Sequence, residues 1–532
     1  MDPAAVAAAH EAELAPDVRR ALGAWSTPGP LVEHVLDRVL PAPGHGPPPT
    51  VLDPACGTGM FLVAAVRRIA AGWRLSRRQA AERCVVGADV QQAAVAAARA
   101  LLWADTGEAG PPPAGWLAGR LRVGDAFALD WPAADVVVGN PPYLSPLATA
   151  TAPTADQVAA WRRRFGTAVS AYTDAAAVFA LLALELVAPG GRVGLVLPQS
   201  LLSARDAAGA RARLAETATL ESLWVAGARM FDAAVLTCVA TWRARPAGDA
   251  EPLRVRRFAG PAFAPLPDVV TSAGDLRGRP TWAHLVGDAF GVPAVPPPAL
   301  AEAGRLGDLA RTAADFRDQY YGLAPHVHEA ADTGPRPTEA PLVTTGLIDP
   351  ARCRWGRRAT RFRGQRWARP VVDLDGLAAT PLGSWAGSRL VPKVLVASQT
   401  KVLEAVVDAE GAWLPSVPVV SVVAPPDDLW HVAAALSSPL TSAWAAGTYL
   451  GAALTTTAIK LSARQVAEVP VPPTRPRAWD DAAEEVRRAH AAVGDDTRRA
   501  HLVAAGERML AAAGVDGDDA VTLLRWWEAR LP

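Results

Sequence analysis

The chain has 532 residues, 50% of them hydrophobic, and its 53 basic and 53 acidic side chains give a formal net charge of +0. By the usual relation between length and domain number, this predicts about two to four globular domains with substantial apolar cores. A neutral chain carries no global field that would attract a polyanion, so any nucleic-acid surface must be a local patch.

The four cysteines predict neither a disulfide framework nor a metal site. They are widely scattered and show no C-x-x-C or Cys/His ligand spacing, which suits a reducing compartment without structural zinc. The amino terminus lacks the basic and apolar regions of a signal peptide, and the best apolar stretch, residues 175–184, is too short to span a membrane. We therefore expect a cytoplasmic protein with no metal and no membrane partner.

In chain order, residues 5–40 predict helices interrupted at residues 25–30, where Thr27 can cap the second helix with Pro28 at its first position. Residues 50–71 then predict a strand, a glycine turn and a helix in immediate succession. Gly57 and Gly59 permit positive φ, so a ligand can lie against the turn and the helix amino terminus. The turn matches neither the phosphate loop nor G-x-G-x-x-G, which disfavours nucleoside triphosphates and NAD.

Two further predicted strands end in acidic residues. Asp89 follows residues 84–88, where an acid is placed to accept hydrogen bonds from ribose hydroxyls. Asp125 follows residues 121–124, where its carboxylate can meet an adenine amino group while Phe127 covers the ring. A single Asp is more often a solvated loop residue or a cap. Three successive strand ends that carry Asp53, Asp89 and Asp125 together indicate a nucleoside pocket.

A fourth apolar run, residues 135–139, ends at Asn140-Pro141-Pro142-Tyr143. Consecutive prolines cannot donate the next ladder hydrogen bonds, so the strand must stop there. Asn140 then lies at a strand's carboxyl end, where ligands bind in open α/β sheets. An amide oxygen beside a proline carbonyl makes a pair of acceptors able to bind an NH2 group. An ordinary strand-ending turn is the alternative.

Taken together, these motifs resemble the class I methyltransferases that use S-adenosylmethionine, and specifically the N6-adenine DNA methylases of restriction-modification systems. The resemblance implies an α/β fold, with a doubly wound Rossmann-like methyltransferase domain and a C-terminal mixed α+β target-recognition domain. Residues 26–28 precede the glycine motif, which is the gamma motif order. The family's positions for S-adenosyl-L-methionine match Thr27, Pro28, Asp53, Ala55, Gly57, Gly59, Asp89, Asp125, Ala126 and Phe127.

The family's catalytic tetrapeptide matches Asn140, Pro141, Pro142 and Tyr143. The resemblance implies that the Asn140 side-chain oxygen and the Pro141 carbonyl accept both N6 hydrogens of an adenine flipped out of double-stranded DNA. Tyr143 is expected to stack on the extruded base. Phe231 is the second expected stacking residue by a looser match, and in the alternative it is a core residue.

Residues 245–305 are proline-rich and weakly periodic, which predicts a linker. We thus expect a catalytic domain over residues 1–244, the linker over 245–305, a target-recognition domain over 306–475 and a helical segment over 476–532.

The segment from Arg352 to Arg369 contains eight arginines, no acidic residue and interleaved aromatic residues. A solvated charged face is the usual explanation of such a run, but aromatic interleaving favours contact with a nucleic-acid backbone. The residues expected to bind DNA are Arg352, Arg354, Arg357, Arg358, Arg361 and Arg363, with Arg366 and Arg369 in the same run.

The sequence argues against a fused nuclease of the common metal-dependent type, which needs an Asp/Glu-x-Lys element. The residues two before the only lysines are Val391, Gln399 and Ala458. We predict modification without cleavage, with any restriction or defence subunit encoded separately. Two rivals stay open: a methyltransferase acting on an RNA base amine or a glutamine amide, and a non-catalytic DNA-binding protein of the same fold.

Overall fold

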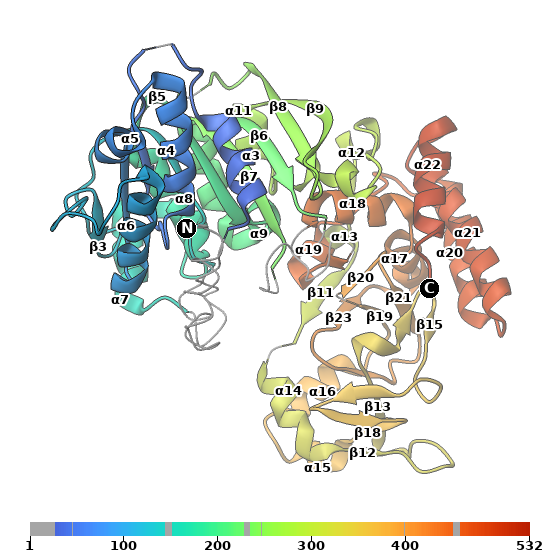
Figure 1. Cartoon of the computed structure of the whole chain (residues 1–532). Helices are drawn as coiled ribbons and strands as arrows, with labels where there is room; N and C mark the ends of the chain where they lie inside the picture. Colours follow the sequence, from blue (N-terminus) through green and yellow to red (C-terminus); the bar gives the residue numbers. More distant parts are fainter. Residues whose placement is uncertain are drawn as a thin grey trace. The chain divides into compact units, whose positions relative to one another are not determined.

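The computed structural model describes residues 27–44, 46–143, 152–227, 235–245, 247–315, 317–397, 399–450 and 458–532. The chain divides into two compact units, residues 1–289 (unit 1) and 290–532 (unit 2), which are drawn in Figure 1.

A nine-stranded sheet organises unit 1, in the order β3-β2-β1-β4-β5-β7-β6-β8-β9. The strands from β3 to β5 are parallel, and β7 runs antiparallel to both β5 and β6. The chain moves from β1 outward through β2 to β3 and then returns to place β4 on the other side of β1. In open α/β sheets, ligands bind at such a reversal, at the carboxyl ends of the strands, here those of β1 and β4. The strands are β1 (Val51–Asp53), β2 (Val85–Asp89), β3 (Leu121–Val123), β4 (Ala134–Gly139), β5 (Val187–Pro198), β6 (Thr219–Val225), β7 (Thr237–Arg243), β8 (Pro252–Ala259) and β9 (Ala264–Ser272).

Helices pack on both faces of this sheet, as the doubly wound prediction requires. Helices α3 to α6 share one core with strand residues such as Val51, Val85 and Val136, whereas α8 packs against β4 and β5. Strands covered on both faces need continuous apolar runs, which explains the valine-rich β2 and β4. The helices are α3 (Gly29–Val39), α4 (Met60–Trp73), α5 (Arg77–Cys84), α6 (Gln92–Thr106), α7 (Ala155–Phe165), α8 (Ala175–Leu186), α9 (Ser200–Ser203), α10 (Ala208–Thr217) and α11 (Ala273–Gly278).

Unit 1 extends further than the predicted catalytic domain. Residues that the sequence assigned to a linker form β8 and β9, which lengthen the main sheet. Their prolines are compatible with this position because β9 is the edge strand, and Pro252 is the first residue of β8. The boundary between the two units, near residue 290, lies inside the predicted linker, but the earlier part of that linker forms the edge of the main sheet.

Unit 2 is mixed α+β, as the sequence predicted. It contains two four-stranded sheets, ordered β11-β23-β19-β21 and β12-β18-β13-β22, and separate small strand pairs. Its strands are β10 (Gly304–Arg305), β11 (Arg311–Ala314), β12 (Val327–Glu329), β13 (Glu339–Val343), β14 (Ile348–Asp349), β15 (Arg352–Cys353), β16 (Thr360–Phe362), β17 (Gln365–Trp367), β18 (Pro370–Asp373), β19 (Lys393–Val396), β20 (Gln399–Thr400), β21 (Ala405–Asp408), β22 (Leu414–Pro415), β23 (Val420–Val423), β24 (Ile459–Lys460) and β25 (Pro470–Val471).

Helices surround these sheets, and the last three follow one another at the end of the chain. Their packing face includes Leu523, Trp526 and Trp527, all of them buried. Among the described residues, no helix is both long and apolar enough to cross a membrane. The helices of unit 2 are α12 (Pro298–Ala301), α13 (Leu306–Leu309), α14 (Arg317–Leu323), α15 (Leu374–Ala378), α16 (Gly383–Arg389), α17 (Leu429–Leu436), α18 (Pro439–Tyr449), α19 (Ala463–Ala467), α20 (Arg477–Ala491), α21 (Asp495–Ala512) and α22 (Gly517–Glu528).

Candidate functional site

The turn after β1 is tied to the end of β2 through Asp89. The Asp89 Oδ2 atom accepts a hydrogen bond from the Gly57 N–H at 3.0 Å, and its Oδ1 accepts from the Gln91 N–H at 2.9 Å. The Cys56 N–H donates to the Ala88 carbonyl at 2.8 Å. These contacts fix the glycine turn beside the second strand end, so the two predicted cofactor-binding elements meet.

Glycine is required at three positions of this site for different reasons. Gly57 and Gly59 have φ of +52° and +85°, which other residues rarely adopt, and Gly59 is the N-cap of α4. A Cβ atom at Gly139, the last residue of β4, would lie 2.8 Å from Asp53 Oδ1. The end of β4 therefore leaves room for the Asp53 carboxyl group at the centre of the sheet.

Asp53 is buried and lacks a cationic partner among the described residues. Only 1% of it is exposed, and its Oδ1 accepts the Ala55 N–H at 3.1 Å. The pKa of Asp53 is raised to about 8, chiefly by burial; the Ala55 hydrogen bond opposes this rise, and the nearby Asp89 adds to it. A cationic group bound beside Asp53 would favour the carboxylate form.

The third strand end joins the same site through the backbone. The Gly124 N–H donates to the Asp89 carbonyl at 3.0 Å, and the Asp125 Oδ1 atom accepts from the Phe127 N–H at 3.0 Å. Asp125 is exposed, Ala126 is buried and Phe127 is half-buried. The ring of Phe127 packs edge-on against Phe179 of α8 at 4.9 Å, so it anchors the loop, and its expected contact with the cofactor stays a prediction.

Both polar atoms of the Asn140 amide have partners. Its Nδ2 donates to Thr27 Oγ1 at 3.2 Å, and its Oδ1 accepts from the Tyr143 hydroxyl at 2.7 Å. Sequence analysis predicted Thr27 as a helix cap, but Pro28 is the N-cap of α3 and no side chain caps this helix. The buried Thr27 hydroxyl holds Asn140 instead.

The Tyr143 hydroxyl lies in surroundings that keep it protonated. Removal from water, together with the nearby Cys238 and Asp174, raises the pKa of Tyr143 well above its ordinary value. Asp174 was not among the predicted site residues. It caps α8 through a 2.9 Å hydrogen bond from the Ala176 N–H, and burial raises its pKa to about 6. An Asp before a ten-residue apolar run was the available signal, but it indicated only a cap.

The remaining predicted site residues divide into those placed and those outside the described residues. Pro141 is buried, and Pro142 is half-buried like Tyr143. Phe231 falls within residues 228–234, outside the described residues. Its expected stacking role stays a prediction.

Half of the arginines in the basic segment of unit 2 are engaged in internal ion pairs, and their expected contact with DNA stays a prediction. Arg352 is 8% exposed and pairs with Asp495, while its Nη2 donates to the Ala492 carbonyl at 3.0 Å. Arg354 and Arg358 both pair with the buried Asp349. Arg369 also forms an ion pair, with Asp332. A run of arginines in the sequence reveals the positive charge, but not the acidic residues elsewhere in the chain that pair with it.

The other four arginines of this segment are exposed and form no ion pair within the described parts of the chain. They are Arg357, Arg361, Arg363 and Arg366.

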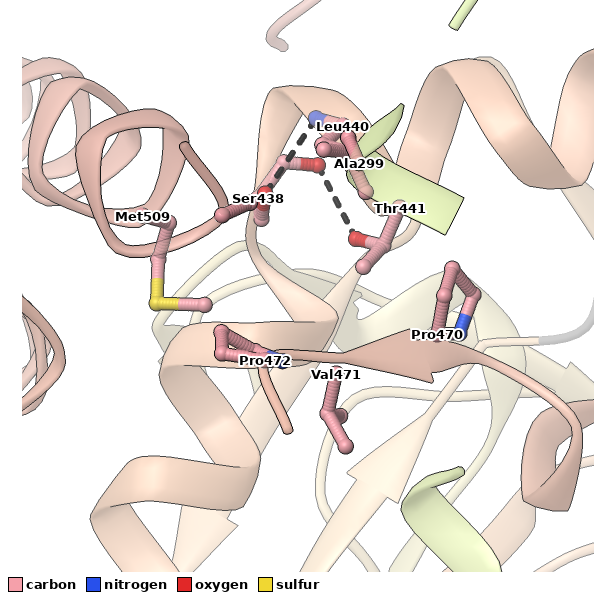
Figure 2. A pocket seen from close by; sticks show the side chains of 9 residues that line it. Ala299, Ser438, Leu440, Thr441, Pro470, Val471, Pro472 and Met509 are labelled. Atoms are coloured by element: carbon pink, nitrogen blue, oxygen red, sulfur yellow. Dashed lines mark hydrogen bonds between the residues drawn. The ribbon is translucent and has the colours of Figure 1, made fainter. Parts of the chain in front are cut away.

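Unit 2 also contains a small cavity. Its volume is about 10 Å³, and it lies between α18, β25 and α21, with Met509 and Val471 on its walls (Figure 2). The Ser438 side chain accepts from the Leu440 N–H at 3.2 Å, and the Thr441 hydroxyl donates to the Ala435 carbonyl at 2.7 Å. Since these groups serve the start of α18 and the space holds about one water, we interpret the cavity as a packing gap.

Comparison with known proteins agrees with this geometry. Residues 12–241 match the family model described as "N-6 DNA Methylase". No curated protein matches the sequence significantly. The Type IIL restriction-modification enzyme MmeI, solved in complex with DNA, aligns with a TM-score of 0.61 at 12% identity, over 100% of this chain and 82% of that chain. The DrdV–DNA complex aligns with a TM-score of 0.54 at 12% identity, over 92% of this chain and 59% of that chain.

At 12% identity these two structures show a shared fold, and the family match is confined to residues 12–241 within the first unit. The family model covers the glycine turn, the acidic strand ends and the Asn140 tetrapeptide. The N-terminal region of this chain, residues 12–241, is therefore similar to the N-6 DNA methylase family.

Proposed function

We propose that the protein transfers a methyl group from S-adenosyl-L-methionine to the N6 atom of an adenine flipped out of duplex DNA. The observation that carries the proposal is the Asn140 amide, held by Thr27 and Tyr143 at the end of β4. Asn140 directly follows β4, and β4 is paired with β1. The end of β1 carries Asp53 and is followed by the glycine turn.

The chain's own residues suit the proposed cofactor. Asp53 is a buried carboxyl group whose raised pKa would be relieved by a cation, and S-adenosylmethionine is cationic. Gly57 and Gly59 let the backbone approach a ligand closely. A carboxylate has about four acceptor positions, so Asp89 can accept ribose hydroxyls while it holds Gly57 and Gln91. When bound, the cofactor supplies an electrophilic methyl group on sulfur.

Asn140 and Pro141 would activate the amine. The lone pair of an exocyclic adenine nitrogen is delocalised into the ring, so it is a poor nucleophile until the two N–H bonds are drawn to acceptors. The Tyr143 hydroxyl uses one lone pair of Asn140 Oδ1, which leaves the other for the amine. Acceptors fixed before the reaction favour the positive charge that develops on nitrogen.

Thr27 contributes by fixing which way the amide faces. Because Nδ2 donates to the Thr27 hydroxyl, Oδ1 is the atom left toward Tyr143 and the amine. Flipping the base costs a few kcal/mol, which hydrogen bonds and stacking on Tyr143, with Phe231 as the second expected face, would offset.

Duplex DNA as the substrate is supported by the family match and by the exposed arginines of unit 2. The family model is that of DNA methylases, and both similar structures are complexes with DNA. The exposed members of the basic segment, Arg357, Arg361, Arg363 and Arg366, form no ion pair with described residues and are available for phosphate contacts.

Transfer of radiolabelled methyl from the cofactor tests the proposal. Duplex DNA incubated with the full chain and then digested to nucleosides should yield labelled N6-methyldeoxyadenosine. Label found only in RNA or on a protein glutamine amide would refute the assignment, and DNA binding without transfer would identify a non-catalytic protein. The same duplex incubated with Mg²⁺ should stay uncut, since we propose that any restriction or defence activity belongs to a separate subunit.

A further inference from the structure

Unit 2 contains a short two-stranded ribbon in which two positively charged side chains lie directly opposite each other. The ribbon, here called the arginine hairpin, consists of β16, β17 and the two turn residues Arg363 and Gly364. Arg361 of one strand lies directly opposite Arg366 of the other, and both are exposed. Like charges directly opposite each other destabilise a strand pair. Neither arginine forms an ion pair with any described residue. No ion pair within the described chain therefore compensates for their mutual repulsion.

The opposite face of the arginine hairpin is fixed to the core of unit 2. Phe362 is 2% exposed and packs against the Tyr320 ring at 5.0 Å. The Arg363 N–H donates to the Tyr320 hydroxyl at 3.1 Å, and the Trp367 indole N–H donates to the Phe362 carbonyl at 3.2 Å. The ribbon is therefore a rigid support, and only its outer face is open to a partner.

The turn residue Arg363 is placed in a conformation that arginine rarely adopts. Its φ is +53° and that of Gly364 is +77°, the signs of a type I′ hairpin turn, whose first position favours Asn, Asp or Gly. Its guanidinium lies 4.5 Å from the centre of the Tyr321 ring, and Tyr321 is 47% exposed. A disfavoured backbone position that carries a long, oriented cation is the kind of strain retained at functional sites.

We propose that the arginine hairpin enters the major groove of DNA, with Arg363 reading a guanine and Arg361 and Arg366 contacting phosphates. The major groove admits a two-stranded ribbon, and arginine binds guanine O6 and N7 in a bidentate manner. Arg363 is the base reader because it lies at the tip and its planar group is already oriented by Tyr321, which reduces the entropy lost on binding. The flanking pair supplies the sequence-independent charge. This inference rests on the proposed function, which takes duplex DNA as the substrate.

Substitution of Arg363→Asn tests the base contact. Asn favours the turn's positive φ, so the hairpin fold is retained while the guanidinium is lost. Duplexes retained by the full chain from a random-sequence library are sequenced for wild type and variant. One guanine position of the bound sequence should become degenerate, with discrimination there reduced roughly 5- to 150-fold and the other positions unchanged. An unaltered bound sequence, or uniform weakening at every position, would overturn the assignment.

The double substitution Arg361→Gln/Arg366→Gln tests the phosphate contacts. Affinity for duplex DNA, measured by fluorescence anisotropy over a salt series, should fall without a change in bound sequence, and the salt slope should decrease by about two. Arg508→Gln, at an exposed position of α21, is the matched control and should leave the slope unchanged. An equal slope in wild type and double variant would remove the hairpin from the interface. Because binding is measured without methyl transfer, a catalytically silent protein that binds DNA this way would refute the proposed reaction and leave the hairpin assignment standing.

Discussion

The Thr27 hydroxyl accepts a hydrogen bond at 3.2 Å from the side-chain amide of Asn140, a residue 113 positions later in the chain. The contact joins the start of α3 to the end of β4, two segments that the sequence assigned to cofactor binding and to catalysis respectively. It gives Thr27 a role in orienting the Asn140 amide, which we propose to be catalytic, and this role is separate from any contact with the cofactor.

Substitution of Thr27→Val should slow methyl transfer more than it weakens cofactor binding. Val keeps the shape but leaves the Asn140 Nδ2 atom without its partner, and losing a buried hydrogen bond of about 1 kcal/mol corresponds to a roughly fivefold to tenfold lower kcat. Thr27→Ser retains the hydroxyl and should restore most of the rate. Steady-state kinetics and calorimetric titration with the cofactor check both effects. A matching loss of cofactor affinity would assign Thr27 to the cofactor instead.

Substitution of Asn140→Ala should abolish most turnover and leave cofactor binding nearly intact. Removing one fixed electrostatic partner of a transition state typically costs a factor of about 100 to 1,000 in kcat, and Asn140 supplies one of the two proposed acceptors. Tyr143→Phe is the milder companion, since it keeps the ring and removes only the hydroxyl that contacts Asn140. Single-turnover measurements at saturating cofactor give the rate of methyl transfer for each variant without a contribution from cofactor binding. An Asn140→Ala variant with wild-type rates would contradict the mechanism.

The elements of unit 1 that could be predicted are those set by local sequence. A valine-rich run stopped by two prolines specifies a strand that ends at Asn140, and Gly57 and Gly59 specify a turn, because these effects act within a few residues. The joint reading of three acidic strand ends also depended on parallel topology, which places successive carboxyl ends at one edge. The sheet order and the hydrogen bonds of Asp89 bring these strand ends together, and the nucleoside pocket stays a prediction.

What could not be predicted depends on residues far apart in sequence. Arg352 and Asp495 lie 143 positions apart, so a run of arginines looked like one exposed surface until its partners were located. Similarly, the prolines of β9 were compatible with either a linker or an edge strand, and only the sheet order decides between them. The hairpin turn at Arg363 was missed because Arg-Gly is not a common type I′ sequence.

The pH dependence of stability should report Asp53. Its folded-state pKa of about 8 lies above the ordinary 3.8, so the folded protein binds the proton more tightly, and stability falls as pH rises from about 4 to about 8. Asp53→Asn keeps an oxygen for the Ala55 N–H and removes the titration. Its melting temperature relative to wild type should therefore rise across that window and level off above it. The exposed Asp125→Asn is the control. Parallel pH profiles for wild type and Asp53→Asn would contradict the buried, protonated carboxyl.

Cofactor binding should be linked to the same proton. A cation bound beside Asp53 favours its carboxylate, so below about pH 8 binding should release a proton into solution. Calorimetric titrations in two buffers that differ in ionisation enthalpy measure this release directly. The Asp53→Asn variant should show no such difference between buffers, along with weaker binding. Equal binding enthalpies in both buffers for the wild type would place the cofactor's charge away from Asp53.

The two classes of arginine in unit 2 should respond oppositely to substitution. Arg352→Ala removes a nearly buried side chain that pairs with Asp495 and binds carbonyls at the carboxyl end of α20, so unfolding free energy should fall by about 1–3 kcal/mol. DNA affinity at a temperature where the variant is folded should change little. Arg361→Ala should do the reverse, with stability within about 0.5 kcal/mol of wild type and weaker DNA binding. Denaturant unfolding and a binding titration on the same preparations provide the comparison. An Arg352→Ala variant that is fully stable yet fails to bind DNA would return Arg352 to the DNA-contacting set.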